Sequence, residues 1–256
     1  MTGRGRRERS FQLDGGRFRV ISSGDDRGDG VFVLVHGIGV SHRYFTGLHD
    51  ELARRGEVHS VDLPGFGGLP KPEQAPSVPQ MAAMLRVVLD RLGLGVVTLV
   101  GQSMGAEWVV ALAALRPAEQ TAGVVLIGPV VDEEHRTIVA QSRALALDIL
   151  LEPLRANAVV LQDYLRCGPA WFLRESRHMV DYSIEDGVAD LAMPVLVIRG
   201  GQDPIAGTAF CRRLRDRAPR GGMAVVPGHH HLVQFTAPRA VASAVRQIEA
   251  IVGVPR

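Results

Sequence analysis

Residues 101–105 have the sequence Gly-Gln-Ser-Met-Gly, which is a G-x-S-x-G motif. The apolar run Val96–Val100 before it is typical of a buried strand, and Ala106–Leu115 after it is typical of a helix. In that context the motif forms a sharp turn with the serine at its tip. The hydroxyl then stands at the helix N-terminus, where backbone N–H groups stabilise developing negative charge. The spacing therefore predicts Ser103 as a nucleophile, with a plain glycine turn as the alternative.

Three adjacent histidines, His229, His230 and His231, follow the predicted strand Met223–Val226. A serine hydroxyl is a weak nucleophile, and histidine is the base that most often activates it. The loops after parallel strands gather at one edge of a sheet, so these histidines are predicted to lie near Ser103. A metal site is the alternative, but adjacent side chains diverge and no other ligand type has a suitable spacing. Position alone leaves open which of the three is the base.

A carboxylate is needed to hold the histidine in one tautomer. Asp203 follows the predicted strand Val195–Ile198 and precedes the histidine loop, so the chain order is serine, aspartate, histidine. Each member of this series comes just after a strand, which favours Asp203 as the acid. An aspartate before Pro204 also commonly starts a turn, and this is the alternative explanation. Asp132, after the predicted strand Gly123–Ile127, is the reserve candidate.

Buried strands alternate with helical patterns along most of the chain, which predicts an α/β fold with a mostly parallel central sheet and helices on both faces. One helix is predicted to start at a capping box on Ser77 and to stop at Gly93, and a C-terminal helix is predicted to start at Thr236. The remaining predicted strands are Ser10–Asp14 and Arg17–Ser22, joined by a turn at Gly15 and Gly16, then Val31–Val35 and Val58–Val61.

Residues 130–191 break this alternation, because they have helical periodicity and no convincing strand. We expect a helical cap (lid) insertion over one end of the sheet, between core segments 1–129 and 192–256. Ordinary connecting helices are the alternative, but connections are usually much shorter. One helix face is predicted to carry Leu154, Ala158, Leu161 and Leu165. Apolar residues suited to a pocket are Trp171, Phe172 and Met179, and arginines that would hold a carboxylate or simply lie on solvated helix faces are Arg155, Arg166, Arg174 and Arg177.

The composition excludes a disordered chain, because 46% of the 256 residues are apolar and 22% are charged. Basic residues number 29 and acidic residues 27, a balance too even for a general nucleic-acid or acidic-membrane binder. Two cysteines do not make a disulfide framework, which is typical of a reducing compartment. No apolar segment follows the basic stretch Met1–Arg9, so we expect a frayed tail rather than a signal peptide and a cytoplasmic location.

Taken together, the motifs resemble the α/β-hydrolase fold superfamily, in its branch of capped esterases and carbon–carbon bond hydrolases. The resemblance covers about residues 31 to 250. Residues 36–39 (His-Gly-Ile-Gly) resemble the family's oxyanion loop, and residues 62–67 (Asp-Leu-Pro-Gly-Phe-Gly) resemble its D-x-x-G-x-G loop. His231 matches the P-G-x-x-H…P pattern that ends at Pro238, so the resemblance selects His231 as the base.

The resemblance implies a catalytic triad of Ser103, Asp203 and His231, and an oxyanion hole from the backbone N–H groups of Ile38 and Met104. It implies no cofactor and no metal. The substrate expected is a small, fairly apolar carboxylic ester. The alternatives are a carbon–carbon bond hydrolase of a dicarbonyl acid (meta-cleavage type), a lyase or cofactor-free haloperoxidase, and a non-enzymatic ligand receptor. No nucleic-acid or membrane partner is expected, and a homodimer is left open.

Several polar residues near these motifs are predicted to be structural. His36 and Asp62 are expected to organise their loops. Residues 41–44 are expected to form the first turn of a helix, and the alternative is that they line the site. Glu107 departs from the small residues common after the serine motif, and a buried carboxylate there needs solvation, pairing or a proton. We expect it to pair with an arginine from a neighbouring loop.

Overall fold

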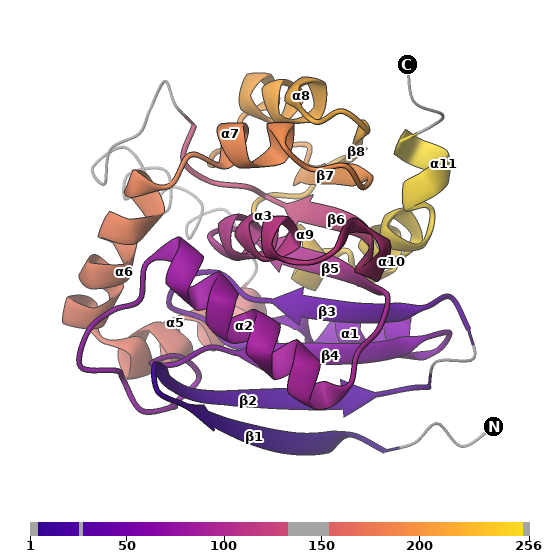
Figure 1. Cartoon of the computed structure of the whole chain (residues 1–256). Helices are drawn as coiled ribbons and strands as arrows, with labels where there is room; N and C mark the ends of the chain where they lie inside the picture. The colour runs from indigo at the N-terminus through magenta and orange to yellow at the C-terminus, as the bar shows by residue number, and fades with distance from the viewer. Residues whose placement is uncertain (1–4, 26–27, 133–153, 253–256) are drawn as a thin grey trace.

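A single mixed sheet forms the centre of the molecule (Figure 1). The computed structural model describes residues 5–25, 28–132 and 154–252. In these residues eight strands are ordered β1-β2-β4-β3-β5-β6-β7-β8, with β1 and β2 antiparallel to their neighbours and the others parallel. The strands are β1 Arg7–Leu13, β2 Gly16–Ser23, β3 Val31–Val35, β4 Glu57–Asp62, β5 Val97–Gln102, β6 Thr121–Ile127, β7 Val195–Gly200 and β8 Gly221–Val226.

The first strand corrects the prediction of a frayed basic tail. It begins at Arg7 rather than at Ser10, and Arg7 lies opposite Ser22 in the antiparallel pair. Pairing with β2 supplies the backbone partners that a tail of polar residues lacks by itself. Leu13 lies opposite Gly16, so the hairpin turn is formed by residues 14 and 15, one position earlier than predicted.

Helices cover both faces of the sheet and form two separate apolar clusters with it. One cluster contains β3 residues Val33 and Val35, and the other contains Phe32 and Leu34, as expected for a strand buried on both faces. In the described part of the chain no helix is long and apolar enough to cross a membrane. The first face carries α2 (Val78–Leu92), α3 (Gly105–Leu115), α7 (Ile184–Ala189) and α8 (Thr208–Arg217), and the second carries α1 (Thr46–Ala53), α9 (Val233–Thr236), α10 (Pro238–Arg246) and α11 (Ile248–Val252).

The predicted capping box is present at the start of α2, where the Ser77 side chain accepts from the Gln80 backbone and the Gln80 side chain accepts from the Ser77 backbone. Gly93 ends the helix in the left-handed region with φ 72°. The C-terminal prediction was wrong in detail. Thr236 is the last residue of α9, and its hydroxyl donates to the carbonyl of Leu232. The helix α10 starts after Ala237, before a break that separates it from α11.

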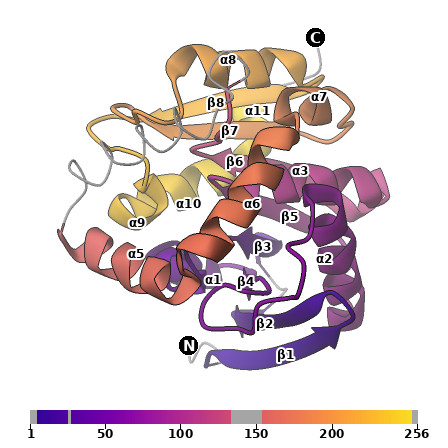
Figure 2. The ribbon, with the colours of Figure 1, turned by 90° about the vertical axis from the view of Figure 1, so that its left-hand side faces the viewer.

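The described part of the chain between β6 and β7 contains the helices α5 (Leu154–Cys167), α6 (Pro169–Asp181) and α7. Figure 2 shows α6 crossing the carboxyl edge of the parallel strands, with α5 beside it. Residues 133–153 of the predicted cap lie outside the described residues, and its boundaries as a separate unit stay a prediction.

The predicted apolar face of α5 was wrong, because Leu161 and Leu165 are 60% and 75% exposed. The buried face instead contains Val160 and Asp163. The Ser41 hydroxyl donates to Asp163 at 2.5 Å, and this bond turns the polar side of the helix towards the loop after β3. Of the other two residues predicted on this face, Ala158 is exposed and the side chain of Leu154 is not described.

Candidate active site

Ser103 lies at the turn between β5 and α3 and has φ 56°, in the left-handed region that non-glycine residues seldom adopt. Such a conformation costs about 1–2 kcal/mol. The flanking glycines allow the turn, because a Cβ at Gly101 would lie 2.2 Å from the Gly105 carbonyl oxygen and one at Gly105 would lie 2.2 Å from that of Val35. The Ser103 N–H donates to the carbonyl of Ile127 at 2.9 Å. The serine is therefore held at the carboxyl edge of the sheet.

Asp203 and His231 form a buried pair, with Oδ2 of the aspartate 3.0 Å from Nδ1 of the histidine. The other carboxylate oxygen accepts from the N–H groups of Ile205 at 2.8 Å and Ala206 at 2.9 Å. Burial alone raises the pKa of Asp203, but the charge of His231 and these hydrogen bonds outweigh it and lower the pKa below its usual value. An ionised Asp203 orders the ring so that Nδ1 carries a proton and Nε2 is left to act as a base.

Arg199 holds the loop that carries Asp203 through hydrogen bonds. This residue was not identified from the sequence. Its guanidinium donates to the carbonyls of Ala206 at 2.8 Å and Asp203 at 3.1 Å and to the Thr208 hydroxyl at 2.9 Å. The residue is 5% exposed and lies near the end of β7. No sequence motif marks an arginine in an apolar strand for such a role, so the role of Arg199 could not be predicted from the sequence.

Several loops that follow parallel strands meet around these residues. The Gln102 side-chain amide donates to the His231 carbonyl at 3.5 Å, which links the serine turn to the histidine loop. A Cβ at Gly37 would lie 2.8 Å from the Cβ of Ser103, and one at Gly128 would lie 2.9 Å from Nδ1 of His231. The structure therefore places Ser103, Asp203 and His231 at one edge of the sheet, as the topology predicted.

The other candidate residues have different partners. His229 Nδ1 lies 2.9 Å from the Thr236 hydroxyl, and His230 is half-buried beside it. The reserve acid, Asp132, pairs with Arg213. Among the described residues there is no group of three His, Cys, Asp or Glu side chains arranged to hold a metal ion. Of the three histidines, His231 is thus the one that contacts Asp203.

His36 shapes the loop that contains Ile38. Its Nε2 accepts from the Leu63 N–H at 3.2 Å, and its Nδ1 lies 2.7 Å from the Gly37 carbonyl, so Nδ1 is the protonated nitrogen. Burial lowers the pKa of His36, which keeps the ring neutral. Its bonds join the loops after β3 and β4, which is the structural role predicted for this residue.

Asp62 also joins the loops after β3 and β4, through hydrogen bonds from Arg19 and His42. It accepts from Arg19 Nε at 2.8 Å, from the His42 N–H at 2.6 Å and from His42 Nδ1 at 2.7 Å. Residues 42–45 form a short 3-10 helix capped by Ser41, as predicted for this segment. Glu107 is fully buried in α3, and its charge adds to burial in raising the pKa of Tyr182 to about 12. Its pairing with an arginine stays a prediction.

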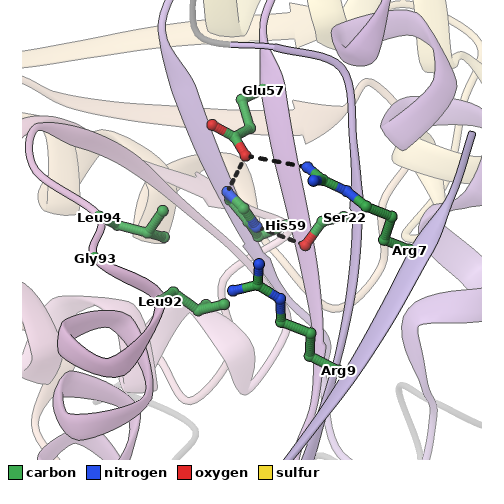
Figure 3. Close-up of a pocket in the computed structure, with 8 residues that line it drawn as sticks. All are labelled: Arg7, Arg9, Ser22, Glu57, His59, Leu92, Gly93 and Leu94. Carbon is green, nitrogen blue, oxygen red and sulfur yellow. Dashed lines mark hydrogen bonds and ion pairs between the residues drawn. The ribbon is translucent and has the colours of Figure 1, made fainter. Parts of the chain in front are cut away.

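A second serine–histidine–carboxylate array lies near the opposite end of the strands (Figure 3). The Ser22 hydroxyl is 2.8 Å from Nδ1 of His59, and Nε2 of His59 is 3.4 Å from Glu57. These side chains border a pocket of about 140 Å³ that Arg7, Arg9 and the end of α2 also line. Burial, with smaller contributions from His49, Arg7 and Arg9, lowers the pKa of His59 to about 4.

Comparison with known proteins places this architecture in context. A family model described as "Alpha/beta hydrolase family" matches residues 32–244. The dihydrolipoyllysine-residue acetyltransferase component of the acetoin cleaving system of Pseudomonas putida is 27% identical in an alignment of 228 residues. The alignment covers 82% of this chain and 60% of that protein. The chain thus spans less than two thirds of the length of this relative.

Two crystal structures are similar over nearly the whole chain. E-2-(acetamidomethylene)succinate hydrolase superposes with a TM-score of 0.78 at 21% identity, covering 95% of this chain and 99% of that one. An esterase from Rhodococcus sp. ECU1013 superposes with a TM-score of 0.76 at 20% identity, covering 97% and 99%. At these identities the likeness shows the fold alone.

Proposed function

The chain belongs to the alpha/beta hydrolase family, and from this premise we propose that it is a serine hydrolase that cleaves a small, fairly apolar carboxylic ester. The observation that carries the proposal is the strained Ser103 turn at the sheet edge that also holds the buried Asp203–His231 pair. A serine in this conformation exposes its hydroxyl beyond the strand, and the pair supplies an oriented base. A serine that only forms part of a structural turn needs neither the strained conformation nor the adjacent pair.

In the proposed reaction, His231 Nε2 takes the proton of Ser103 as Oγ attacks the ester carbonyl carbon. The backbone N–H groups of Ile38 and Met104 hold the oxyanion of the tetrahedral intermediate. When the intermediate collapses, the imidazolium gives its proton to the departing alcohol and an acyl-enzyme remains. Water, activated by the same histidine, then releases the carboxylic acid. Asp203 stays ionised throughout and stabilises the imidazolium.

The cap residues favour an ester over a dicarbonyl acid. Arg174 and Arg177 lie on the exposed face of α6, and Arg166 pairs with Asp163 at 3.6 Å. The side chain of Arg155 is not described. The three arginines with described side chains are therefore exposed or already paired, whereas Trp171 and Met179 belong to the same buried apolar cluster as Ile38 and Met104.

A fluorophosphonate probe tests the proposal directly. We expect stoichiometric labelling with the mass increase on Ser103, and a burst of p-nitrophenol when enzyme at high concentration meets p-nitrophenyl butyrate. A lyase or haloperoxidase using the same residues gives no acyl-enzyme and no burst. Tight ligand binding without turnover, in a protein whose Ser103 ignores the probe, favours a receptor and contradicts the proposal.

A further inference from the structure

Glu175 is a buried carboxyl group on the inner face of α6. It is 0% exposed, and Trp171, one helical turn earlier on the same face, is 3% exposed. In the described part of the chain, neither carboxyl oxygen of Glu175 nor Nε1 of Trp171 has a hydrogen-bond partner. Native proteins satisfy nearly all buried polar groups, so two such side chains one turn apart require an explanation.

The helix α6 lies across the carboxyl edge of the parallel strands (Figure 2), and Ser103 follows β5 at that edge. Trp171 packs against Phe66 in the loop after β4, with ring centroids 6.4 Å apart, and a Cβ at Gly65 would lie 2.5 Å from its Nε1. Phe172 contacts the loop after β3, because a Cβ at Gly39 would lie 3.2 Å from it. The turn of α6 that carries Trp171 and Glu175 therefore lies over the loops after β3 and β4, and Gly37 of the first loop borders Ser103.

The protonation states of the Glu175 carboxyl group and the Trp171 indole determine which kind of atom can form hydrogen bonds with them. Burial raises the pKa of Glu175 to about 8, so at neutral pH the carboxyl group is mostly protonated and has an O–H to donate. The indole N–H of Trp171 can donate but cannot accept. The nearby thiol of Cys167 is also neutral, since burial raises its pKa to about 11, with a smaller contribution from Glu175. A shared partner of both donors must be an acceptor.

We propose that Glu175 and Trp171 form a hydrogen-bonding subsite for a second oxygen of an uncharged ester substrate, such as a ketone oxygen away from the scissile bond. This inference rests on the proposed function of Ser103. A ketone oxygen has two lone pairs and accepts from both donors. It also costs less to bury than a carboxylate, which would place its charge in an apolar cluster. The subsite narrows the substrate class from simple esters to oxo esters.

Binding to the Ser103→Ala protein tests the subsite without turnover. Ethyl 4-oxopentanoate has its ketone in the acyl half and 2-oxopropyl butanoate in the alcohol half, with ethyl pentanoate and propyl butanoate as ketone-free counterparts. By calorimetry we expect one oxo ester to bind about 10-fold more tightly than its counterpart, the size of one well-made hydrogen bond. Which isomer binds tightly identifies the half of the substrate that reaches α6.

Glu175→Leu in the same background is expected to reduce this preference to about one, whereas Glu175→Gln retains most of it because an amide N–H still donates. Trp171→Phe, which keeps the packing and loses the donor, reduces the preference partly. Arg174→Gln on the exposed face of α6 is the matched control and leaves the preference unchanged. A preference that survives Glu175→Leu, or the lack of any preference with Glu175 present, overturns the subsite.

The hydrolysis rates of the four esters by the protein with Ser103 intact separate the two proposals. Hydrolysis of all four at similar kcat/KM, without a preference, overturns the subsite and leaves the serine hydrolase standing. A Glu175-dependent binding preference without hydrolysis of any ester overturns the proposed reaction and leaves the subsite standing.

Discussion

The two serine–histidine–carboxylate arrays of this chain contain the same residue types in different surroundings. At the carboxyl edge, Ser103 is in a strained turn before a helix, and Asp203 has two backbone N–H donors besides His231. At the other end, Ser22 is in the regular strand β2, paired with β1 on one side and β4 on the other. Residue types alone therefore do not make a nucleophile, because the backbone around the serine decides whether the hydroxyl can attack.

The histidines differ in the same way. His59 turns Nδ1 towards Ser22 and Nε2 towards Glu57, at 2.8 and 3.4 Å, and Glu57 is shared with Arg7 at 3.9 Å. His231 instead turns Nδ1 towards Asp203, at 3.0 Å, in a loop that Arg199 braces. The backbone around Ser22 is paired with β1 and β4 in the sheet, whereas Ser103 directly precedes the N-terminus of α3. We therefore expect this second array to be structural.

The largest expected effect comes from the two serines. Ser103→Ala should reduce kcat for p-nitrophenyl butyrate by at least about 10⁴-fold, because the nucleophile is lost and only binding and the oxyanion donors remain. Ser22→Ala should change kcat less than about 2-fold. Steady-state kinetics and circular dichroism of both variants check the pair. Comparable losses in the two folded variants would erase the distinction between the arrays.

The two acids give the next contrast. Asp203→Asn should reduce kcat by about 10³–10⁴-fold, because an amide stabilises the wrong tautomer of the histidine and does not stabilise its charged form. Glu57→Gln, at the corresponding place in the second array, should leave kcat unchanged. The acid-side limb of the pH–rate profile separates a tautomer effect from a general loss of folded protein. A slow Glu57→Gln enzyme would give the second array a part in the reaction.

The sequence predicts the edge of the sheet where the chemistry gathers, because glycine-flanked turns and apolar strands are local signals. The motif around Ser103 and the strand runs before Asp203 and His231 needed no tertiary information. Arg199 and Glu175 were not found, since their roles depend on which groups lie across from them after folding. The same limit explains α5, where helical spacing alone did not foresee that the bond of Ser41 to Asp163 determines the buried face.

The contributions of Glu175, which has no hydrogen-bond partner among the described residues, and of Asp203, which has several, to folding stability change with pH in opposite directions. The folded chain keeps Glu175 protonated up to about pH 8, whereas the ordinary pKa of a glutamate is 4.5. Between these values the folded state binds more protons than the unfolded state, so stability falls as pH rises. Asp203 has a lowered pKa and instead loses its contribution as pH falls through that pKa.

Glu175→Gln should therefore remove the fall in stability that the wild-type protein shows as the pH rises. Relative to wild type, the difference between its free energies of unfolding at pH 8.5 and pH 4.5 should increase by up to about 5 kcal/mol. Urea unfolding at both pH values measures it. Asp181→Asn, exposed at the end of the same helix, is the control and should show no such gain. If Glu175→Gln and wild type have parallel stability profiles, the carboxyl group is not held protonated by the fold.

The smallest effect expected concerns the second array as a structural element. Ser22 is 4% exposed, and its hydroxyl forms a hydrogen bond with the buried ring of His59. Ser22→Ala leaves Nδ1 of His59 without this partner, which should lower the free energy of unfolding by about 1–3 kcal/mol. Urea unfolding at pH 7 measures the loss, and Ser22→Thr, which keeps the hydroxyl and suits a strand, should recover part of it.

If Ser22→Ala is as stable as wild type while its activity is intact, the bond between Ser22 and His59 contributes neither to stability nor to catalysis. A loss of stability with full activity places the hydroxyl in the sheet as a hydrogen-bonding group, and leaves Ser103 as the serine whose backbone makes it reactive.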